Sequence, residues 1–392
     1  MMKQLIYADN AATTKLDLDA FEAMKPFLLE EYGNASQPYS FARKPKQALR
    51  EAREIIARCI GADPEEIFFT SGGTESDNWA IKGVTLANHR PCRIITSQIE
   101  HHAVLRACED MDKLGYPVSY VPVTKEGIVT MEALGGKMTP DVRLVSVMLA
   151  NNEIGTIEPI RELCEMAHRN GALFHTDAVQ AVGHIPIDVK DLGVDLLSAS
   201  AHKFNGPKGI GFLYVKKGTP IVSYASGGAQ EFGMRAGTEN IASIVGMAVA
   251  LKKNYDAMRE TIQRMETLES TLLHHLSMAG LDFVRNGSAY HIPGNISLSF
   301  HNADGEALLH RLDLMGICVS TGAACDTVQT QISHVLSAIG LAEEYAKGTI
   351  RISFGPQNTP EEAEIISNQL ITIKEKTHET NFPRTAHAYF SK

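Results

Sequence analysis

Residues 70–76, with the sequence TSGGTES, could form a binding site for a phosphate group. They lie between an apolar run and a helical pattern that begins at Glu75. Glycine lets the backbone approach an anion closely, and a helix N-terminus offers free N–H groups and the positive end of a dipole. Thr74 adds a hydroxyl group. An ordinary strand-to-helix turn with a Ser or Thr cap is the alternative, because the segment lacks the spacing of the dinucleotide fingerprint and of the P-loop.

Lys203 has neighbours that could hold its amine inward. It ends the segment SASAHK at residues 198–203, and the turn sequence FNGPKG follows at residues 204–209. A confined ammonium loses its proton more readily, and a lysine that forms a Schiff base needs such a setting. The alternative is a solvated lysine at the end of a strand.

Asp177 lies in the segment HTDAVQ at residues 175–180, after another apolar run. A carboxylate there could accept a hydrogen bond from a protonated pyridine nitrogen, the partner that lets the ring of pyridoxal 5'-phosphate (PLP) act as an electron sink. A helix cap or turn aspartate is commoner for any single Asp. The three signals fall in order at the ends of neighbouring predicted strands, and together they predict a PLP site.

The elements that must position these residues alternate between short apolar runs and amphipathic stretches. We expect strands at residues 67–70, 93–96, 144–148, 172–175 and 195–198, with helices at residues 75–85, 102–114 and 159–170. Such alternation predicts an α/β fold with a mostly parallel sheet covered on both faces. Ligands of such sheets bind at the carboxyl ends of the strands.

The C-terminal part of the chain has a different pattern. A long helical stretch at about residues 239–278 precedes two segments with period-two alternation, at residues 295–300 and 349–354. Helices are expected at residues 305–315 and 360–373. A chain of 392 residues is too long for one ordinary core. We therefore predict a large domain at residues 15–255, and a smaller α+β domain formed by residues 1–14 and 256–392.

Composition excludes several classes of protein. The chain is 44% hydrophobic and 21% charged, as soluble globular proteins are, and its net charge of −9 disfavours nucleic acid as a partner. No apolar run is long enough to span a membrane and no leader is evident, so we expect a cytoplasmic protein. No histidine pair has the spacing of a zinc motif. The six cysteines form no CxxC motif and are expected to be free thiols.

Several segments closely resemble the cysteine desulfurases, which belong to the aminotransferase class V branch of the fold-type I PLP enzymes. The resemblance extends from residues 7–14 (YADNAATT) to about Glu362. Its five principal segments are residues 70–78 (TSGGTESDN), 100–101 (EH), 151–155 (NNEIG), 177–180 (DAVQ) and 200–203 (SAHK). It implies a large domain with a mostly parallel seven-stranded sheet between helices, and a smaller α+β domain.

The resemblance also assigns roles in binding PLP. Lys203 would form the Schiff base and later move the α-proton of the substrate. Asp177 would pair with the pyridine nitrogen, and Gln180 would bind the phenolic oxygen of the ring. His101 would stack on the ring and assist proton transfer. The residues that would hold the phosphate are Gly73, Thr74, Ser200, His202 and, from the partner subunit of an obligate homodimer, Thr238.

For the substrate, L-cysteine, the resemblance implies Asn152 and Arg351 as binding residues. A guanidinium binds a carboxylate through two parallel hydrogen bonds. Cys325, in the segment STGAAC at residues 320–325, resembles the nucleophile of the long-loop subgroup (group I), which carries a persulfide to an acceptor. That acceptor would be an iron–sulfur scaffold or a thiolation enzyme. Cys318 lies in an apolar run and is expected in the core.

The sequence departs from the family pattern at two places, and two other functions remain as alternatives. Asp326 follows Cys325 where a hydroxyl residue is common, and a neighbouring carboxylate opposes formation of a thiolate. In residues 354–359 (FGPQNT), the basic or aromatic residue that usually follows the glycine is also absent. One rival is a selenocysteine lyase, or another class V lyase or transaminase that does not use Cys325. The other is an inactive partner-binding platform, which would have no need of Lys203, Asp177 and Arg351 together.

Overall fold

The structure is a computed structural model that describes residues 5–88, 90–321 and 332–381, with only the backbone at residues 376–381. Within these ranges, no helix has the length and apolar character needed to cross a membrane.

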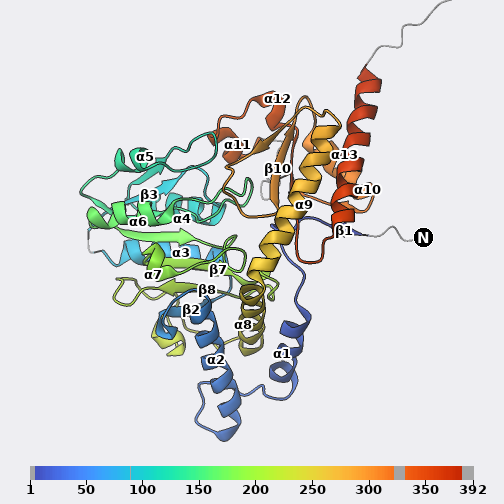
Figure 1. Cartoon of the computed structure of the whole chain (residues 1–392). Coiled ribbons are helices and arrows are strands. Elements are labelled where there is room, and N and C mark those ends of the chain that lie inside the picture. Colours follow the sequence, from blue (N-terminus) through green and yellow to red (C-terminus); the bar gives the residue numbers. More distant parts are fainter. Residues whose placement is uncertain (1–4, 89, 322–331, 382–392) are drawn as a thin grey trace, which may run out of the picture.

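A seven-stranded sheet forms the centre of the molecule (Figure 1). Only β8 runs opposite to the other strands, because it pairs antiparallel with both of its neighbours. The predicted α/β fold with a mostly parallel sheet is therefore confirmed. In spatial order the strands are β2 (Ile67–Thr70), β8 (Gly211–Val215), β7 (Leu196–Ser200), β6 (Leu173–Asp177), β5 (Val142–Ser146), β3 (Arg93–Ser97) and β4 (Val118–Val121).

Helices cover both faces of this sheet. Successive strand residues point to opposite faces, so Phe68 packs into one apolar cluster and Phe69 into another. The cluster around Phe68 includes residues of α3 (Gly73–Leu86) and α4 (His102–Lys113). The cluster around Phe69 contains residues of α1 (Leu18–Leu29), α2 (Arg43–Cys59), α6 (Ile160–Arg169) and α8 (Ile241–Asp256). Apolar strands with both faces buried explain the continuous apolar runs in the sequence.

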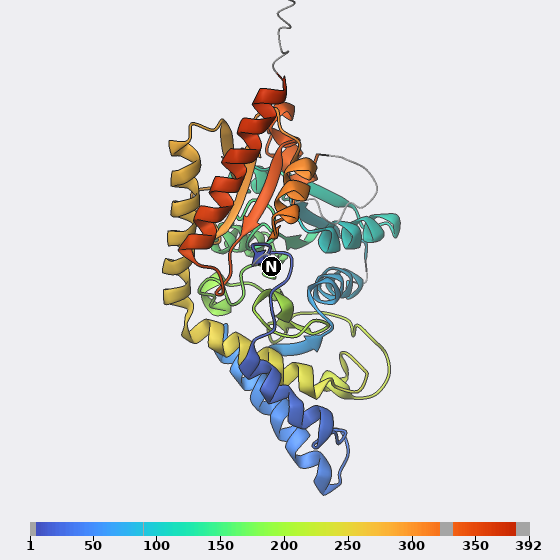
Figure 2. The ribbon, with the colours of Figure 1, turned by 90° about the vertical axis from the view of Figure 1, so that its right-hand side faces the viewer.

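The second unit is built around a three-stranded antiparallel sheet of order β12-β10-β9 (Figure 2). Its separate apolar cluster also includes Ile6 and Ala8. The N-terminal segment joins this unit because β1 (Ile6–Tyr7) pairs in parallel with β11 (Ile317–Cys318). The remaining elements of the unit are β9 (Phe283–Asn286), β10 (Asn295–Phe300), β12 (Thr349–Ser353), α9 (Met258–Met278), α10 (Gly305–Leu314) and α13 (Pro360–Asn381).

The long helical stretch predicted at residues 239–278 is helical in the structure, but it is divided by one break. The structure has two helices, α8 and α9, that meet at Ala257, whose φ of −95° and ψ of 3° leave the helical region. The two helices pack into different apolar clusters on either side of this break. The break lies two residues after the predicted domain boundary at residue 255, and we keep that division as a proposal.

Short elements complete the described part of the chain. They are η1 (Ser40–Ala42), η2 (Pro64–Glu66), α5 (Met131–Gly135), α7 (Val189–Leu192), η3 (Ala201–Lys203), η4 (Gln230–Gly233), α11 (His334–Ala338) and α12 (Glu343–Ala346).

Candidate active site

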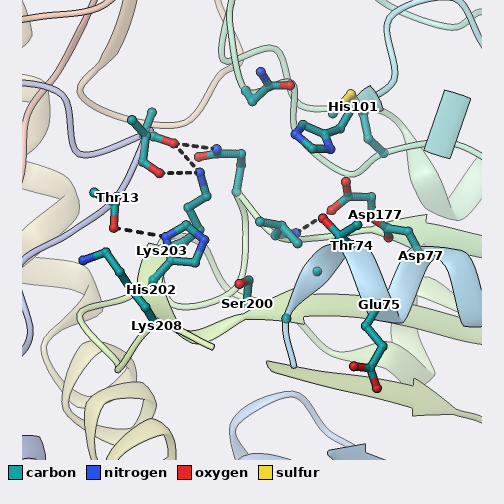
Figure 3. A pocket seen from close by; sticks show the side chains of 18 of the residues that line it. Thr13, Thr74, Glu75, Asp77, His101, Asp177, Ser200, His202, Lys203 and Lys208 are labelled. Atoms are coloured by element: carbon teal, nitrogen blue, oxygen red, sulfur yellow. Dashed lines mark hydrogen bonds between the residues drawn. The ribbon is translucent and has the colours of Figure 1, made fainter. Parts of the chain in front are cut away.

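A cavity of about 520 Å³ opens at the carboxyl ends of the parallel strands, where the fold predicts a ligand. Its lining includes ten of the twelve predicted site residues: Gly73, Thr74, His101, Asn152, Asp177, Gln180, Ser200, His202, Lys203 and Arg351. Figure 3 labels Thr74, His101, Asp177, Ser200, His202 and Lys203 among them. Thr238 does not line it, and Cys325 lies outside the described residues. The roles of all twelve remain predictions.

Lys203 ends η3, directly after strand β7. Its Nζ donates hydrogen bonds to the backbone oxygens of Ala11 at 2.6 Å and Ala12 at 2.9 Å, and its own carbonyl lies 2.9 Å from Nε2 of His184 (Figure 3). The N-terminal segment thus reaches across to the large sheet and contacts this amine. The lysine is held from both its backbone and its amine end.

Asp177 is the last residue of β6 and is buried. Burial raises the pKa of its carboxyl to about 6, although the N–H of Val179, 2.9 Å away, and the charge of Lys203 lower it. Gln180 lies one turn further on, and its Nε2 donates to the oxygen of Ala11 at 2.9 Å. A buried acid and an amide therefore share the cavity with the lysine amine.

The N-terminus of α3 also forms part of the cavity wall. The N-cap is Gly72, which makes no side-chain capping bond and has a φ of 148°, a value that favours glycine. A Cβ at Gly73 would lie 2.5 Å from Cγ2 of Val179, so this position also requires glycine. Free N–H groups at a 14-residue helix suit an anion, and Ser200 and His202 face the same space. This end of the cavity fits the phosphate of PLP, whereas Asp177 and Gln180 fit its ring and Lys203 fits its aldehyde.

His101 is the N-cap of α4, and its Nδ1 accepts a hydrogen bond from the N–H of Ala103 at 3.1 Å. Burial and, to a smaller extent, the positive charge of Lys203 lower the pKa of His101 to about 4. The ring is therefore neutral at physiological pH and carries its proton on Nε2.

Arg351 is buried on β12, in the second unit. Its Nη1 donates to the carbonyl of Asn152 at 2.9 Å, and its Nη2 donates to Oδ1 of Asp9 at 2.7 Å. Its buried Nε has no hydrogen-bond partner among the described residues. The Arg351 backbone also pairs with Ser320, with N···O distances of 3.0 and 2.6 Å. The start of the predicted nucleophile segment is thereby fixed beside the predicted carboxylate-binding residue.

Sequence reasoning missed several residues that line the cavity. Asp77 lies on α3 one turn after Gly73, and this i, i+4 spacing could have identified it. Ser71, Gly72 and Glu75 belong to the predicted phosphate-binding segment, and the other lining residues without a predicted role are Ala11, Ala12, Thr13, Met148, Val179, Lys208 and Gly209. The family resemblance included residues 7–14, but their place in the cavity depends on tertiary contacts.

Thr238 is exposed at the end of a segment that two ion pairs fix to the rest of the chain. Arg53 and Glu231, both buried, form two side-chain hydrogen bonds of 2.7 and 2.9 Å. Arg235 Nε donates to Oε1 of Glu75 at 2.9 Å, next to the N-terminus of α3. An exposed Thr238 beyond a fixed segment is compatible with the prediction that it reaches a partner subunit.

Comparisons with known proteins place the chain in a family. The model of the class V aminotransferases matches residues 6–366. A cysteine desulfurase IscS of Dictyoglomus turgidum is 48% identical over 96% of both chains, and one of Methanosarcina thermophila is 44% identical over 95% of this chain and 92% of that protein. Among solved structures, a NifS-like protein matches with a TM-score of 0.90 and 38% identity, over 95% of this chain and 100% of that one. The chain belongs to the class V aminotransferase family and, within it, to the cysteine desulfurases.

Proposed function

We propose that this enzyme uses PLP to remove sulfur from L-cysteine, giving L-alanine and a persulfide on Cys325. The observation that carries the proposal is the placement of Lys203, Asp177 and Arg351 around one cavity, in a chain 48% identical to a cysteine desulfurase. A protein with 34% identity and a TM-score of 0.80 is described as SspA in complex with cysteine, and it covers 90% of this chain and 100% of its own.

PLP, when bound, supplies an aldehyde for covalent attachment and a ring that accepts electrons from the substrate. The Lys203 amine would hold this group and, once released, would take the α-proton of the substrate. Its two carbonyl acceptors, at Ala11 and Ala12, orient it. Asp177 would bind the ring nitrogen and Gln180 the phenolic oxygen. Gly73, Thr74, Ser200 and His202 would bind the phosphate.

Arg351 and Asn152 would bind the α-carboxylate of cysteine. The guanidinium is already oriented by the carbonyl of Asn152 and by Asp9, and its Nε has no partner among the described residues. A positioned guanidinium recognises a carboxylate more strongly and more selectively than a lysine does. The neutral ring of His101, with a proton on Nε2, would donate a hydrogen bond within the cavity.

Cys325 would attack the sulfur of the substrate. The new S–S bond forms as the bond between the β-carbon and sulfur of the substrate breaks, and the three-carbon remainder takes up protons to become L-alanine. Cys325 follows Ser320 by five residues in the sequence. Ser320 pairs with Arg351, which lines the cavity, and this pairing supports Cys325 as the nucleophile.

The persulfide would pass to an acceptor protein, either an iron–sulfur scaffold or a thiolation enzyme. The enzyme would act as a homodimer in which Thr238 reaches the phosphate of the partner subunit. The five described cysteines are free thiols, which suits the reducing cytoplasm proposed for it.

The test measures alanine and sulfide formed from L-cysteine, with and without a reductant such as dithiothreitol. Wild-type enzyme should form alanine and sulfide in equal amounts when the reductant is present. Cys325→Ser should abolish sulfide release and leave the visible absorption of the bound cofactor unchanged. Cys318→Ser is the matched control and should keep full activity. Sulfide release that survives in Cys325→Ser would show that another group is the nucleophile.

A further inference from the structure

Three buried carboxyl groups lie together at the cavity, two of them in its wall, and the proposed function uses only one of them. Asp177 ends β6, Asp77 lies on α3, and Glu100 precedes α4. Their exposed fractions are 4%, 1% and 0%. Figure 3 shows Asp77 beside Asp177 in the cavity wall. A second carboxyl group so close to the acid that binds the ring nitrogen must affect the charge there.

The hydrogen bonds of the three groups differ. Asp177 accepts from the N–H of Val179, and Glu100 Oε1 accepts from the N–H of Met148 at 3.0 Å and from the hydroxyl of Ser97 at 2.5 Å. In contrast, Oδ1 of Asp77 and Oε2 of Glu100 are buried without a hydrogen-bond partner in the described structure. An ionised carboxylate with an unpaired buried oxygen is costly, whereas a protonated one is much less so.

His175 lies beside Asp77 and would supply a positive charge to it if its ring were protonated. Its Nε2 lies 3.6 Å from Oδ1 of Asp77. The ring is fixed between two hydroxyls, with Nδ1 2.8 Å from Ser146 Oγ and Nε2 3.0 Å from Ser198 Oγ. Burial lowers the pKa of His175 to about 3, so the ring is neutral and does not balance a charge on Asp77.

The surroundings favour a charge on Asp177 over one on Asp77. Burial raises the pKa of Asp77 well above its usual range, the charges of Asp177 and Glu100 raise it further, and Ser198 opposes them. The N–H of Val179 and the positive charge of Lys203 both favour the ionised form of Asp177. Two adjacent carboxyl groups in a buried site do not both ionise, and the better-paired one keeps the charge.

We propose that Asp77 is a positioning residue that carries a proton beside neutral His175, and so leaves Asp177 as the one carboxylate that faces the ring nitrogen of the cofactor. The inference rests on the proposed function for its catalytic meaning. The protonated Asp77 fills the space beside Asp177 and adds no second negative charge. An asparagine has the same charge and nearly the same shape as a protonated aspartic acid.

The first experiment locates the proton by infrared difference spectroscopy of the holoenzyme at about pH 7. Wild type minus Asp77→Asn should contain the carbonyl band of a protonated carboxyl group, sensitive to exchange into deuterium oxide. A carboxylate band in its place would overturn the proposal. The same measurement on the chain without cofactor reports on Asp77 even if the chain does not bind PLP. Failure of the inference about Asp77 is therefore distinguishable from failure of the proposed function.

The second experiment compares the same chemical change at the two neighbouring acids. In Asp77→Asn, the pH midpoint of the visible cofactor absorption should stay at the wild-type value and kcat/KM for cysteine should fall less than threefold. Asp177→Asn should alter the absorption and lower kcat/KM at least a hundredfold. Asp77→Ala, which leaves space beside Asp177, should shift the midpoint and weaken cofactor binding about tenfold.

Rescue by asparagine is the result that separates positioning from a merely structural role. If Asp77→Asn shifts the midpoint as Asp177→Asn does, Asp77 acts as an anion and the proposal is wrong. If Asp77→Ala keeps the wild-type midpoint and cofactor affinity, Asp77 does not position Asp177, and the proposal is equally overturned.

Discussion

The Lys203 amine donates to two uncharged carbonyl oxygens, and this choice of acceptor bears on its chemistry. A carbonyl orients an ammonium and stabilises its positive charge less than a carboxylate does. The nearby carboxyl group of Asp177 is buried and is proposed to bind the ring nitrogen. The residues around Lys203 therefore orient the amine, as its proposed role in proton transfer requires.

The geometry at Arg351 predicts weaker substrate binding when lysine replaces it, because lysine keeps the positive charge but lacks the planar guanidinium group. Arg351→Lys should raise KM for cysteine and lower kcat/KM roughly tenfold to a hundredfold, because one charged hydrogen bond is worth about 1.5–3 kcal/mol. Steady-state kinetics of alanine formation measures this effect. The absorption of the bound cofactor should not change.

Arg285→Lys is the matched control for this prediction. Arg285 lies on β9 of the same sheet, and its Nε donates to Glu269 at 3.2 Å, but it does not line the cavity. An unchanged KM in Arg351→Lys would remove Arg351 from the substrate site.

The buried carboxyl group of Glu158, just before α6, makes the stability of the fold depend on pH. Its Oε2 accepts from the N–H of Val129 at 2.9 Å, and its buried Oε1 has no hydrogen-bond partner among the described residues. Burial raises the pKa of its carboxyl from 4.5 to about 8, against the effect of the Val129 N–H. Between these values the folded chain keeps a proton that the unfolded chain releases, so this group destabilises the fold increasingly as pH rises.

Glu158→Gln should remove this destabilisation, since the glutamine oxygen still accepts from Val129. The free energy of unfolding of the variant should exceed that of wild type by an amount that grows from about pH 4.5 to about pH 8, at up to about 1.4 kcal/mol per pH unit. Urea unfolding at several pH values measures it. Glu132→Gln, at an exposed position, serves as the control. A constant difference between Glu158→Gln and wild type would contradict the account.

The elements were predictable where a local pattern decides them. Residues 295–300 alternate with period two and form β10 over the same residues, and the predicted helix at residues 102–114 is α4 within one residue. Residues 211–215 were not predicted as a strand, and no local pattern reveals that β8 runs antiparallel between β2 and β7. The break at Ala257 was missed because it depends on two separate cores.

The site was predictable where its residues follow strands. Lys203, Asp177 and Gly73 each lie at or just beyond a strand end and meet in the cavity. Asp77 received no predicted role, although it lies one turn after Gly73 on α3. The carbonyls of Ala11 and Ala12 were missed because backbone acceptors leave no mark in a sequence. These contacts arise from tertiary packing.

At the scale of the whole molecule, the proposal requires two chains, because Thr238 is exposed and does not line the cavity of its own subunit. Two chains co-expressed with different tags, one carrying Lys203→Ala and the other Thr238→Val, test this arrangement. In a hybrid dimer, one site would receive both substitutions and the other would receive neither.

The purified hybrid should therefore regain about half of the wild-type activity per dimer at limiting cofactor, as symmetry requires for a shared site. Each variant alone should be less active under the same conditions. A hybrid no more active than the average of the two variant dimers would show that Thr238 acts within its own subunit, or not at all.

The central claim is that Lys203 holds the cofactor, and borohydride reduction followed by peptide mapping tests it most directly. Reduction of the holoenzyme should fix a pyridoxyl group to the amine of Lys203, and mass spectrometry should find it on the peptide that contains residues 198–208. Lys203→Ala should bind no cofactor covalently. A pyridoxyl group on Lys208 or on any other lysine, or on none, would contradict the account.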